Sequence, residues 1–496
     1  MQEIDEKRFT ALAEKYNLIP VFREYAADIV TPVSALGRLA ADDGDMFLLE
    51  SVESRERFGR YSFIGIDPRG KFTVENAVPY YADANGKREL KICGSAFETL
   101  REMLKEINAP ELAELPPLFG GAVGYMNYEA ACEFETLPRH EAGADEVSCA
   151  FMLLDELVIF DNVRHTMKIV ACTRPAEFAT PEAAYLHALD RIRRLHRRIS
   201  TPYLPPARTA CEHRAFTAEI GRDEYIAKVE AAKRLIREGE AIQIVLSQKF
   251  HAELNVPPID LYRALRLINP SPYTFFLRIG GTLLIGSSPE ALVKLDRGAA
   301  VLRPIAGSRV CRLDASDGAV ADELLKDEKE RAEHLMLVDL ARNDLGRIAL
   351  PGSVQVKEFM RVERYSHIMH LVSQVEALPA PECDAFSLVR ATFPAGTLTG
   401  APKIRAMELI YELEGSPRNA YGGALGYFSY SRNMDMAITI RTLVIRDGRI
   451  TVQAGAGIVA DSDGGSEYAE CAGKAQALFH AVELAARGID FEGVAL

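Results

Sequence analysis

The chain lacks several features that would place it in a particular class of protein. It has no tryptophan, none of its eight cysteines belongs to a C-x-x-C pair, and no apolar run approaches the roughly 18 residues that cross a bilayer. The charged start, MQEIDEKRFT, has no apolar segment of the kind found in signal peptides. Cysteines scattered singly are typical of reduced thiols in the cytosol. We therefore expect a soluble cytoplasmic protein that does not enter a membrane.

The chain also lacks the excess of positive charge that binds nucleic acids and anionic membranes. It carries 58 basic and 71 acidic residues, a net charge of −13, so we expect neither as a partner. Any site for an anion must then depend on local arginines. The stretch RPIAGSRVCR, from Arg303 to Arg312, has three of them beside a Gly-Ser pair, and this combination indicates such a site. The inert Ala306 stands within it.

Two stretches divide the chain. Residues 181–199 have apolar side chains at the period of an amphipathic helix that begins at a proline. The following STPYLPPART contains three prolines, which disfavour helix and strand alike, and predicts a linker around residues 200–215. We expect an N-terminal region over residues 1–205 and a second region over residues 215–490. Within them, GGAVGYMNYE is echoed by GGALGYFSYS, through chance, an ancient duplication or two equivalent strands of one sheet.

Acidic side chains cluster on two expected helices. Glu330 and Glu333 share a helical face within residues 327–349, and Glu467 and Glu470 share another in GGSEYAECAGKA. Two carboxylates from separate helices could hold Mg²⁺, which uses few protein oxygens and leaves positions for water and substrate. A solvated acidic surface is the alternative.

Two further stretches could bind an anion through backbone amides. In FPAGTLTGAPKIRAMELIYELEG, Thr399 or Gly400 can cap a helix with Pro402 in its first turn, where unpaired amides attract anions. VQAGAGIV predicts a strand whose small residues let amides approach a carboxylate. An ordinary helix cap and a tight turn are the alternatives. His370, on an apolar stretch, is either a hydrogen-bonded core residue or a catalyst, and no Ser-His-Asp order, HExxH or zinc pattern accompanies it.

Six motifs occur together in the second region, namely RPIAGSR, EHLMLVDLARNDLGRI, MHLVSQVEA, GTLTGAPKIRAMELI, YGGALGYF and QAGAGIVADSDGGSEYAECAGKA. In their order and number they resemble the chorismate-utilising enzymes, and among these the anthranilate synthase component I family. The resemblance is strong over about residues 220–485 and weaker in the N-terminal half, where LLESVESRERFGRYSFIG carries it. It implies an α+β fold of packed antiparallel β-sheets flanked by helices, an αββα sandwich.

The resemblance also implies a role for each matched residue. Glu290, in SSPEALVKL, corresponds to a general acid that protonates the departing 4-hydroxyl of chorismate, a role that a raised pKa would suit. His370 and Thr397 correspond to residues that serve the later loss of pyruvate. Glu333 and Glu470 correspond to the ligands of Mg²⁺, which would hold the ring carboxylate. The substrate clamp would consist of Gly307, Ser308, Tyr421, Arg441, Gly455, Ala456 and Gly457.

Two positions that lack a lysine indicate the nucleophile. Related enzymes that make isochorismate or salicylate have a lysine that activates water where this chain has Gln243, and those that make 4-amino-4-deoxychorismate have a lysine at Ala306. Without either lysine, ammonia is left to attack ring carbon C2. No cysteine here has the glycine-flanked setting of a glutaminase, so the resemblance implies a glutamine amidotransferase subunit as partner in a hetero-oligomer. GSRVCR departs from the family's usual GTRPRG, which leaves that loop's geometry open.

The N-terminal half resembles the family's feedback site for tryptophan. Its walls would be LLES, which ends at Ser51, and NPSPYTFF, which contains Pro272, Tyr273 and Thr274. From the residues alone, a strand edge beside a proline-rich turn is the favoured interpretation. The absence of tryptophan from the chain would help an enzyme that is made during tryptophan starvation.

The implied function is that of an anthranilate synthase large subunit, which converts chorismate and ammonia to anthranilate and pyruvate in tryptophan biosynthesis and is inhibited by tryptophan. One alternative is aminodeoxychorismate synthase component I, which Ala306 disfavours. Another is an enzyme that stops at 2-amino-2-deoxyisochorismate. A third is a non-catalytic tryptophan-sensing protein, which the retention of Glu290, Glu333, His370 and Glu470 disfavours.

Overall fold

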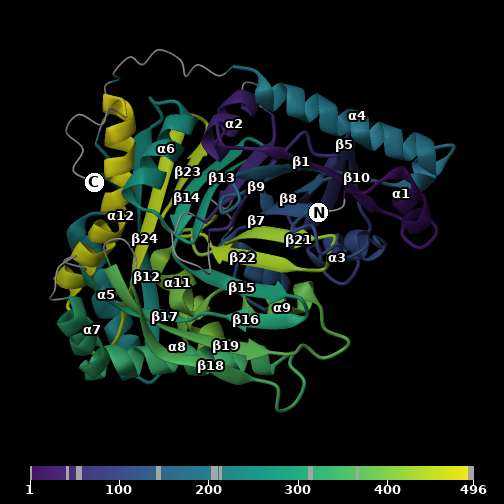
Figure 1. The fold of residues 1–496 in the computed structure, drawn as a ribbon. Coiled ribbons are helices and arrows are strands. Elements are labelled where there is room, and N and C mark those ends of the chain that lie inside the picture. The colour runs from purple at the N-terminus through teal and green to yellow at the C-terminus, as the bar shows by residue number, and fades with distance from the viewer. Residues whose placement is uncertain are drawn as a thin grey trace.

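Two β-sheets organise the computed structural model, which describes residues 3–40, 44–51, 59–140, 147–202, 211, 215–310, 317–364 and 368–489. Within these residues each sheet has 12 strands, and all the strand pairs are antiparallel. Helices cover the outer face of each sheet (Figure 1). The expected α+β sandwich of packed antiparallel sheets is confirmed.

The first sheet contains, in spatial order, β1 (Ile19–Ala26), β10 (Thr166–Thr173), β9 (Glu156–Asp161), β3 (Tyr61–Ile66), β2 (Met46–Glu50), β13 (Tyr273–Ile279), β14 (Thr282–Ser288), β23 (Thr442–Arg446), β24 (Arg449–Ile458), β12 (Gln243–Glu253) and β11 (Thr217–Ala218), with β20 (Gly400–Ala401) paired to β12. The second contains β17 (Ile305–Val310), β19 (Ile368–Ala377), β16 (Ala299–Leu302), β15 (Ala291–Asp296), β22 (Met434–Ile438), β21 (Ala424–Ser429), β7 (Gly121–Met126), β8 (Val147–Leu154), β4 (Gly70–Glu75), β5 (Val78–Asp83) and β6 (Gly86–Glu89), with β18 (Gln355–Arg364) paired to β19.

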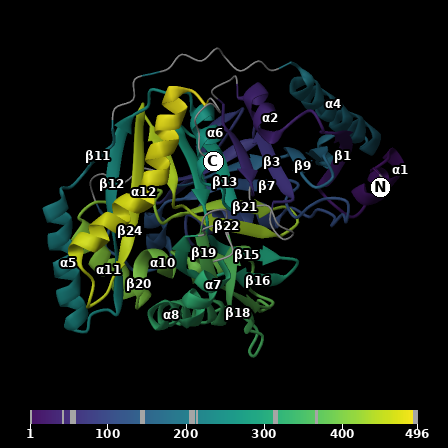
Figure 2. The same ribbon diagram turned by 60° about the vertical axis from the view of Figure 1, so that its left-hand side comes forward.

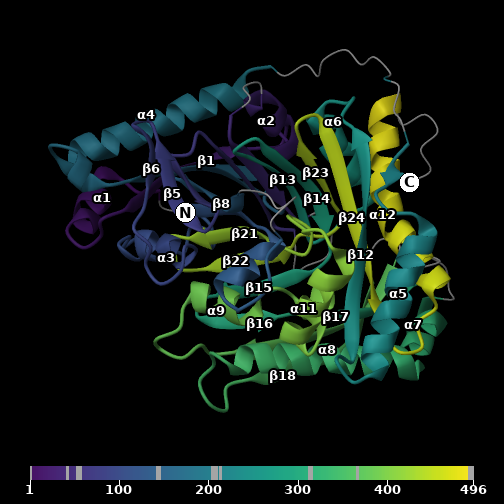
Figure 3. The ribbon, with the colours of Figure 1, turned by 180° about the vertical axis from the view of Figure 1, so that it is seen from behind.

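The helices divide between the two outer faces. On the first sheet lie α1 (Glu6–Ala13), α2 (Pro32–Leu39), α4 (Pro181–Ser200), α5 (Arg222–Arg237), α6 (Pro258–Ile268) and α12 (Gly464–Arg487). Against the second lie α8 (Glu328–Gly346), α7 (Asp317–Lys326) and α9 (Ala385–Thr392), while α10 (Gly396–Thr399) and α11 (Lys403–Glu414) pack beside β12 and α3 (Glu98–Lys105) joins the second sheet's core. Two short 3-10 helices among the described residues are η1 (Tyr128–Glu133) and η2 (Pro175–Glu177). The view turned by 60° and the view from behind show the same layers (Figures 2 and 3).

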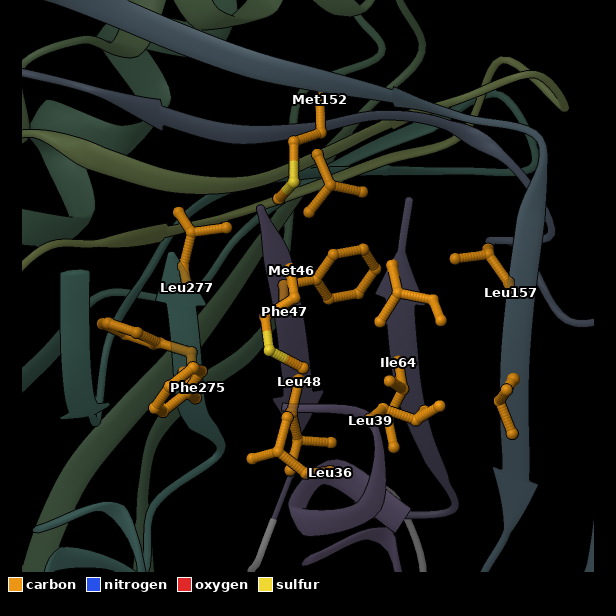
Figure 4. Close-up of a cluster of buried hydrophobic side chains, with 14 of the residues drawn as sticks. Leu36, Leu39, Met46, Phe47, Leu48, Ile64, Met152, Leu157, Phe275 and Leu277 are labelled. Carbon is orange, nitrogen blue, oxygen red and sulfur yellow. The ribbon is translucent and has the colours of Figure 1, made fainter. Parts of the chain in front are cut away.

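Alternation along β2 shows how the layers form. Phe47 and Leu48 point to opposite faces of the strand and both are fully buried. Phe47 belongs to the same core as Met152 of β8, whereas Leu48 lies toward Leu36 and Leu39 of α2 (Figure 4). One strand therefore contributes both to the interior between the sheets and to the layer beneath the helices.

The predicted linker follows a helix that the structure confirms. The expected helix over residues 181–199 is α4, which begins at Pro181 with Thr180 as its N-cap. Much of the linker, residues 203–210 and 212–214, lies outside the described residues. Strands from both sides of the linker occur in each sheet, so the two regions of the chain build their sheets together.

The two echoed glycine-rich stretches are neighbouring strands. β7 and β21 pair antiparallel at the centre of the second sheet, with Gly124 directly opposite Gly426. A Cβ at Gly124 would lie 1.9 Å from the carbonyl oxygen of Ala150, and one at Gly426 would lie 2.0 Å from that of Asp435. The glycines thus permit close approach of the flanking strands, as two equivalent strands in one sheet would require.

Two of the connections by which the chain crosses between the sheets are hydrogen-bonded to each other. β14 in the first sheet is followed by Pro289, which has no N–H for a sheet ladder, and β15 then joins the second sheet. β22 and β23 make the return crossing. The backbone N–H of Ile438 donates to the carbonyl of Glu290 (3.0 Å), and that of Ser287 donates to the carbonyl of Arg441 (3.1 Å). The segments that carry Glu290 and Arg441 are therefore neighbours where they cross between the sheets.

One expected helix start is wrong. Neither Thr399 nor Gly400 caps the helix of GTLTGAPKIRAMELI, because these residues belong to α10 and β20. The helix is α11, and its N-cap position is taken by Pro402, which makes no side-chain cap. Across the described part of the chain, no helix combines the length and apolar character needed to cross a membrane.

Candidate active site

Glu290 lies at the crossing between the sheets with its carboxyl group turned to Thr397. The Thr397 hydroxyl donates to Glu290 Oε1 at 3.0 Å, across 107 positions of sequence. Burial raises the pKa of Glu290 to about 7, although the Thr397 hydrogen bond and the positive charge of Lys474 oppose this shift. A carboxyl group that is still partly protonated near neutral pH can deliver a proton to a leaving hydroxyl.

Arg441 stands at the return crossing in the left-handed conformation, with φ 50°. Its side chain is largely buried, and burial lowers its pKa, but a guanidinium remains charged at neutral pH. No carboxylate of the described residues forms an ion pair with it. A buried guanidinium without a carboxylate partner is suited to binding the carboxylate of a ligand through its planar fork.

Tyr421 and the small residues of β24 form one surface. The Tyr421 hydroxyl lies 2.7 Å from where a Cβ on Gly455 would be, and the Gln243 amide nitrogen lies 2.2 Å from a Cβ on Gly457. Side chains at these glycines would therefore collide with the residues opposite them. Burial raises the pKa of Tyr421, so its phenol keeps its proton. Lys474 of α12 donates to the Gly455 carbonyl at 2.9 Å and so ties β24 to that helix.

His370 is held by the strand β17 that carries Gly307 and Ser308. The Nδ1 atom of His370 donates to the Gly307 carbonyl (2.9 Å), which fixes the ring and its tautomer. Burial lowers the pKa of His370, and the charge of Arg441 acts in the same direction, so the imidazole is neutral near pH 7. Gly307 has φ 66° beside a register shift between Ala306 and Ser308. The Ser308 side chain lies outside what the structure describes.

The arginines of RPIAGSRVCR do not hold an anion in the expected way. Arg303 pairs with Glu363 (2.7 Å) and Arg309 with Glu330 (2.9 Å), so both are neutralised by the protein itself. Arg312 falls outside the described residues. The expectation that this stretch's arginines bind the anion is therefore wrong for Arg303 and Arg309, and Arg441 has the environment that they were expected to have.

Glu333 of α8 and Glu470 of α12 approach each other from separate helices. Burial raises the pKa of Glu333, and the negative charges of Glu470 and Glu467 add to the effect, while Lys329 opposes it. Glu470 is exposed and pairs with Lys474 at 2.7 Å. Among the described residues there is no cluster of three or more histidine, cysteine or acidic side chains placed to hold a metal.

Residues 45–480 match the family described as chorismate binding enzyme. The chain belongs to that family. It is 42% identical to anthranilate synthase component 1 of Acetivibrio thermocellus over 95% of this chain and 97% of that protein. It is 41% identical to the protein of the same name from Acinetobacter calcoaceticus, over 96% and 97% of the two chains. The crystal structure of anthranilate synthase component I from Streptococcus pneumoniae TIGR4 superposes with a TM-score of 0.76 at 34% identity, covering 92% of this chain and 99% of that one.

Sequence reasoning gave no role to Lys474, although its position on the acidic face of α12 was evident. In this member of the chorismate binding family, Lys474 bonds both the Gly455 carbonyl and Glu470, and its charge lowers the pKa of Glu290. It therefore links the clamp strand, a candidate metal ligand and the candidate acid. The spacing of four residues between Glu470 and Lys474 was the available signal.

The residues expected to bind tryptophan lie on, or directly next to, two neighbouring strands. β2 and β13 pair so that Thr274 is opposite Glu50, which brings LLES beside PSPYT. Pro272 is buried, and the Tyr273 hydroxyl donates to Asp435 Oδ1 at 3.0 Å. The hydroxyl of Ser51 is buried and has no hydrogen-bond partner within the described residues. A buried hydroxyl in that state is available to a ligand.

Proposed function

We propose that this chain is the chorismate-converting subunit of an anthranilate synthase and makes anthranilate and pyruvate from chorismate and ammonia. The observation that carries the proposal is Glu290, a buried carboxyl group with a pKa of about 7 that is held by Thr397 where the two sheets meet. Membership of the chorismate binding family supports it. Turnover of chorismate with ammonium salt, followed by anthranilate fluorescence, tests it.

In this proposal the chain's own groups divide the work between binding and proton transfer. The Arg441 guanidinium and the Tyr421 phenol bind the substrate's carboxylates, and the backbone amides of residues 455–457 are assigned to the same carboxylates. Glu290 gives its proton to the 4-hydroxyl, which leaves as water while ammonia bonds to ring carbon C2. His370, neutral and oriented by Gly307, accepts the ring proton in the later step that releases pyruvate.

Mg²⁺ is part of the same proposal. Burial raises the pKa of Glu333, and the negative charges of Glu330, Glu470 and Glu467 add to that effect. A divalent cation would relieve this repulsion. A site with a small number of oxygen ligands, such as two carboxylates, suits Mg²⁺ better than a softer metal. When bound by Glu333 and Glu470, the ion would hold and neutralise the substrate's ring carboxylate.

Ala306 and Gln243 favour external ammonia as the nucleophile. Ala306 lies in β17 opposite Leu371 and carries no amine, and Gln243 cannot deprotonate water. Both facts disfavour the aminodeoxychorismate synthase and isochorismate-forming alternatives. The contact between Glu290 and Thr397 disfavours a non-catalytic sensor, because a sensor does not require a buried acid.

The ammonia would come from a glutamine amidotransferase subunit in a hetero-oligomer. A cavity of about 560 Å³ opens beside Gln243 and shares Leu337, Leu340, Asp344 and Gly396 with a smaller cavity at Glu290. Ile242, 66% exposed, adjoins Gln243 and gives a partner an apolar contact. A cytoplasmic location suits this proposal, since the described cysteines are free thiols.

We expect the purified chain to form anthranilate with ammonium salts, faster at higher free-ammonia concentration, and to use glutamine only after an amidotransferase subunit is added. The reason is that ammonium has no lone pair, whereas delivered ammonia does. Fluorescence rates with each nitrogen source, with and without the second subunit, measure this. Glutamine-dependent turnover by the pure chain alone would contradict the need for a partner.

Tryptophan is proposed as an inhibitor that binds beside Ser51, Pro272, Tyr273 and Thr274. Inhibition requires that tryptophan bind more tightly to a conformation with poor affinity for chorismate. Coupling of about 1–3 kcal/mol would lower the apparent chorismate affinity roughly 5- to 150-fold. Reciprocity requires chorismate to weaken tryptophan binding by the same factor.

Ser51→Phe should fill this pocket and abolish tryptophan inhibition while anthranilate formation continues. Ser200→Phe, at an exposed position on α4, is the control and should stay fully inhibited. Calorimetry of tryptophan binding and inhibition curves measure both variants. An absence of tryptophan binding to the unmodified chain, or full inhibition of Ser51→Phe, would overturn the regulatory proposal.

A further inference from the structure

Arg418 lies in the connection between α11 and β21, behind the candidate site. Gly415, with φ 68°, ends α11, and Pro417 prevents the helix from continuing. The Arg418 side chain is 1% exposed. A guanidinium removed from water in this way is tolerated only where its N–H groups have acceptors. Each acceptor here belongs to an element that carries, or adjoins, part of the candidate site.

Two of the acceptors are backbone carbonyls. Arg418 Nη1 donates to the carbonyl of Leu398 at 2.6 Å, and Leu398 directly follows Thr397, the partner of Glu290. Arg418 Nη2 donates to the carbonyl of Val245 at 2.7 Å, and Val245 is the strand partner of Gly457. The planar guanidinium of Arg418 thus joins α10, which carries Thr397, to β12, the strand that pairs with β24.

The third acceptor is the carboxylate of Glu414. Its two oxygens take hydrogen bonds from Arg418 Nε (2.9 Å) and Nη2 (2.6 Å). Glu414 Oε1 also accepts from the backbone N–H (2.8 Å) and the hydroxyl (2.7 Å) of Ser247. Ser247 is the strand partner of Gly455 and accepts a further bond from Gln453 on β24. The ion pair therefore fixes β12 directly opposite the clamp.

Two aromatic rings, and a carboxylate from the N-terminal half of the chain, complete the surroundings of Arg418. Its guanidinium lies over the rings of Tyr128 at 4.8 Å and of Tyr421 at 5.6 Å, a favourable cation–π arrangement. The carboxylate of Glu129 accepts from the backbone N–H groups of Arg418 (2.7 Å) and Asn419 (3.0 Å). The N-terminal half thereby fixes the loop that presents Tyr421.

We propose that Arg418 is a positioning residue for the reaction, which holds Tyr421, the strand of Gly455–Gly457 and the Thr397 segment in register with one another. The inference rests on the proposed function, because those groups are assigned to chorismate and to Glu290. Catalytic groups must stay within roughly 0.5 Å of their productive geometry, and a single group that contacts three of their supports sets their relative positions. Loss of the Arg418 contacts should then impair substrate binding and proton transfer together.

The test compares Arg418→Lys with the unmodified chain in steady-state kinetics with chorismate and ammonium. A lysine keeps the charge but cannot bond Leu398, Val245 and Glu414 at once, because it lacks the planar fork. We expect kcat/KM for chorismate to fall about 100-fold, the size expected from a misplacement of about 1 Å. KM should rise and kcat should fall. The pH at which kcat falls on the alkaline side should move to a higher value. The reason is that a loosened Thr397 hydrogen bond no longer lowers the pKa of Glu290.

Arg174→Lys is the matched control, since Arg174 forms a largely buried ion pair with Asp155 (2.5 Å) outside the candidate site. It should lower the melting temperature without changing KM, kcat or the pH limb. Glu414→Gln serves as the second variant if Arg418→Lys does not fold, and its kinetic changes should have the same direction. Reduced thermal stability with unchanged KM, kcat and pH limb would overturn the positioning role. An unmodified chain that forms no anthranilate would instead overturn the proposed function.

Discussion

Glu290→Gln will lower kcat for anthranilate formation by about 10²- to 10⁴-fold, the contribution typical of a general acid. Glutamine is nearly the same size, so chorismate should still bind with a similar KM, but the amide has no proton to give to the 4-hydroxyl. The rate is measured with chorismate and ammonium salt at a fixed concentration of free ammonia. Glu156→Gln is the control and should leave kcat unchanged, because Glu156 lies on β9 and its carboxylate pairs with Arg191 of α4.

The pH dependence follows from the same group. The pKa of Glu290 is raised to about 7, so the acid is protonated below that pH and loses its proton above it. With free ammonia held constant, kcat should fall as the pH rises through about 7 in the unmodified chain. The Gln variant should lose this limb. A variant that keeps most of the kcat and the same limb would remove Glu290 from the role of acid.

Glu333→Gln and Glu470→Gln are each expected to reduce turnover by at least about 100-fold at fixed Mg²⁺. Loss of a hydrogen-bonding partner outside the ligand shell already costs about 10- to 100-fold, and loss of one of two carboxylate ligands should cost more. Chelation of Mg²⁺ by EDTA should stop the reaction of the unmodified chain, and added Mg²⁺ should restore it. Titration of activity with Mg²⁺ should show weaker apparent metal binding in both variants.

Glu328→Gln is the control for the metal prediction, because Glu328 is exposed in the first turn of α8, the helix that carries Glu333. Its Mg²⁺ titration should match that of the unmodified chain. Full activity in EDTA, together with unchanged turnover in the Glu333 and Glu470 variants, would place the metal site elsewhere or remove it from the reaction.

Local periodicity allowed several elements to be predicted from the sequence. The helix beginning at Pro181 and the strand of VQAGAGIV are present, because spacing of apolar residues and small residues acts within one element. The family resemblance assigned Glu290 and Thr397 to different steps of one reaction, and the structure shows that their side chains are hydrogen-bonded. A family resemblance can assign roles to residues in this way even when they are far apart in the sequence.

Contacts that depend on the packing of the two sheets could not be predicted. The sequence shows arginines in RPIAGSRVCR but not that Glu363 and Glu330 neutralise two of them. It also gives no sign that Arg441, alone at the crossing, lacks a carboxylate partner among the described residues. Arg418 is unremarkable in GSPRNAYGG, and its contacts appear only once β12, α10 and η1 surround it. Such partners are set by tertiary packing, which no local pattern encodes.

Product analysis of one reaction tests the central claim most directly. The purified chain is incubated with chorismate, Mg²⁺ and ammonium salt at pH 7 to 8, and anthranilate and pyruvate are quantified by chromatography and mass spectrometry. The account predicts that both products form in equal amounts as chorismate disappears. Accumulation of 4-amino-4-deoxychorismate or of 2-amino-2-deoxyisochorismate without pyruvate, or unchanged chorismate, would contradict it.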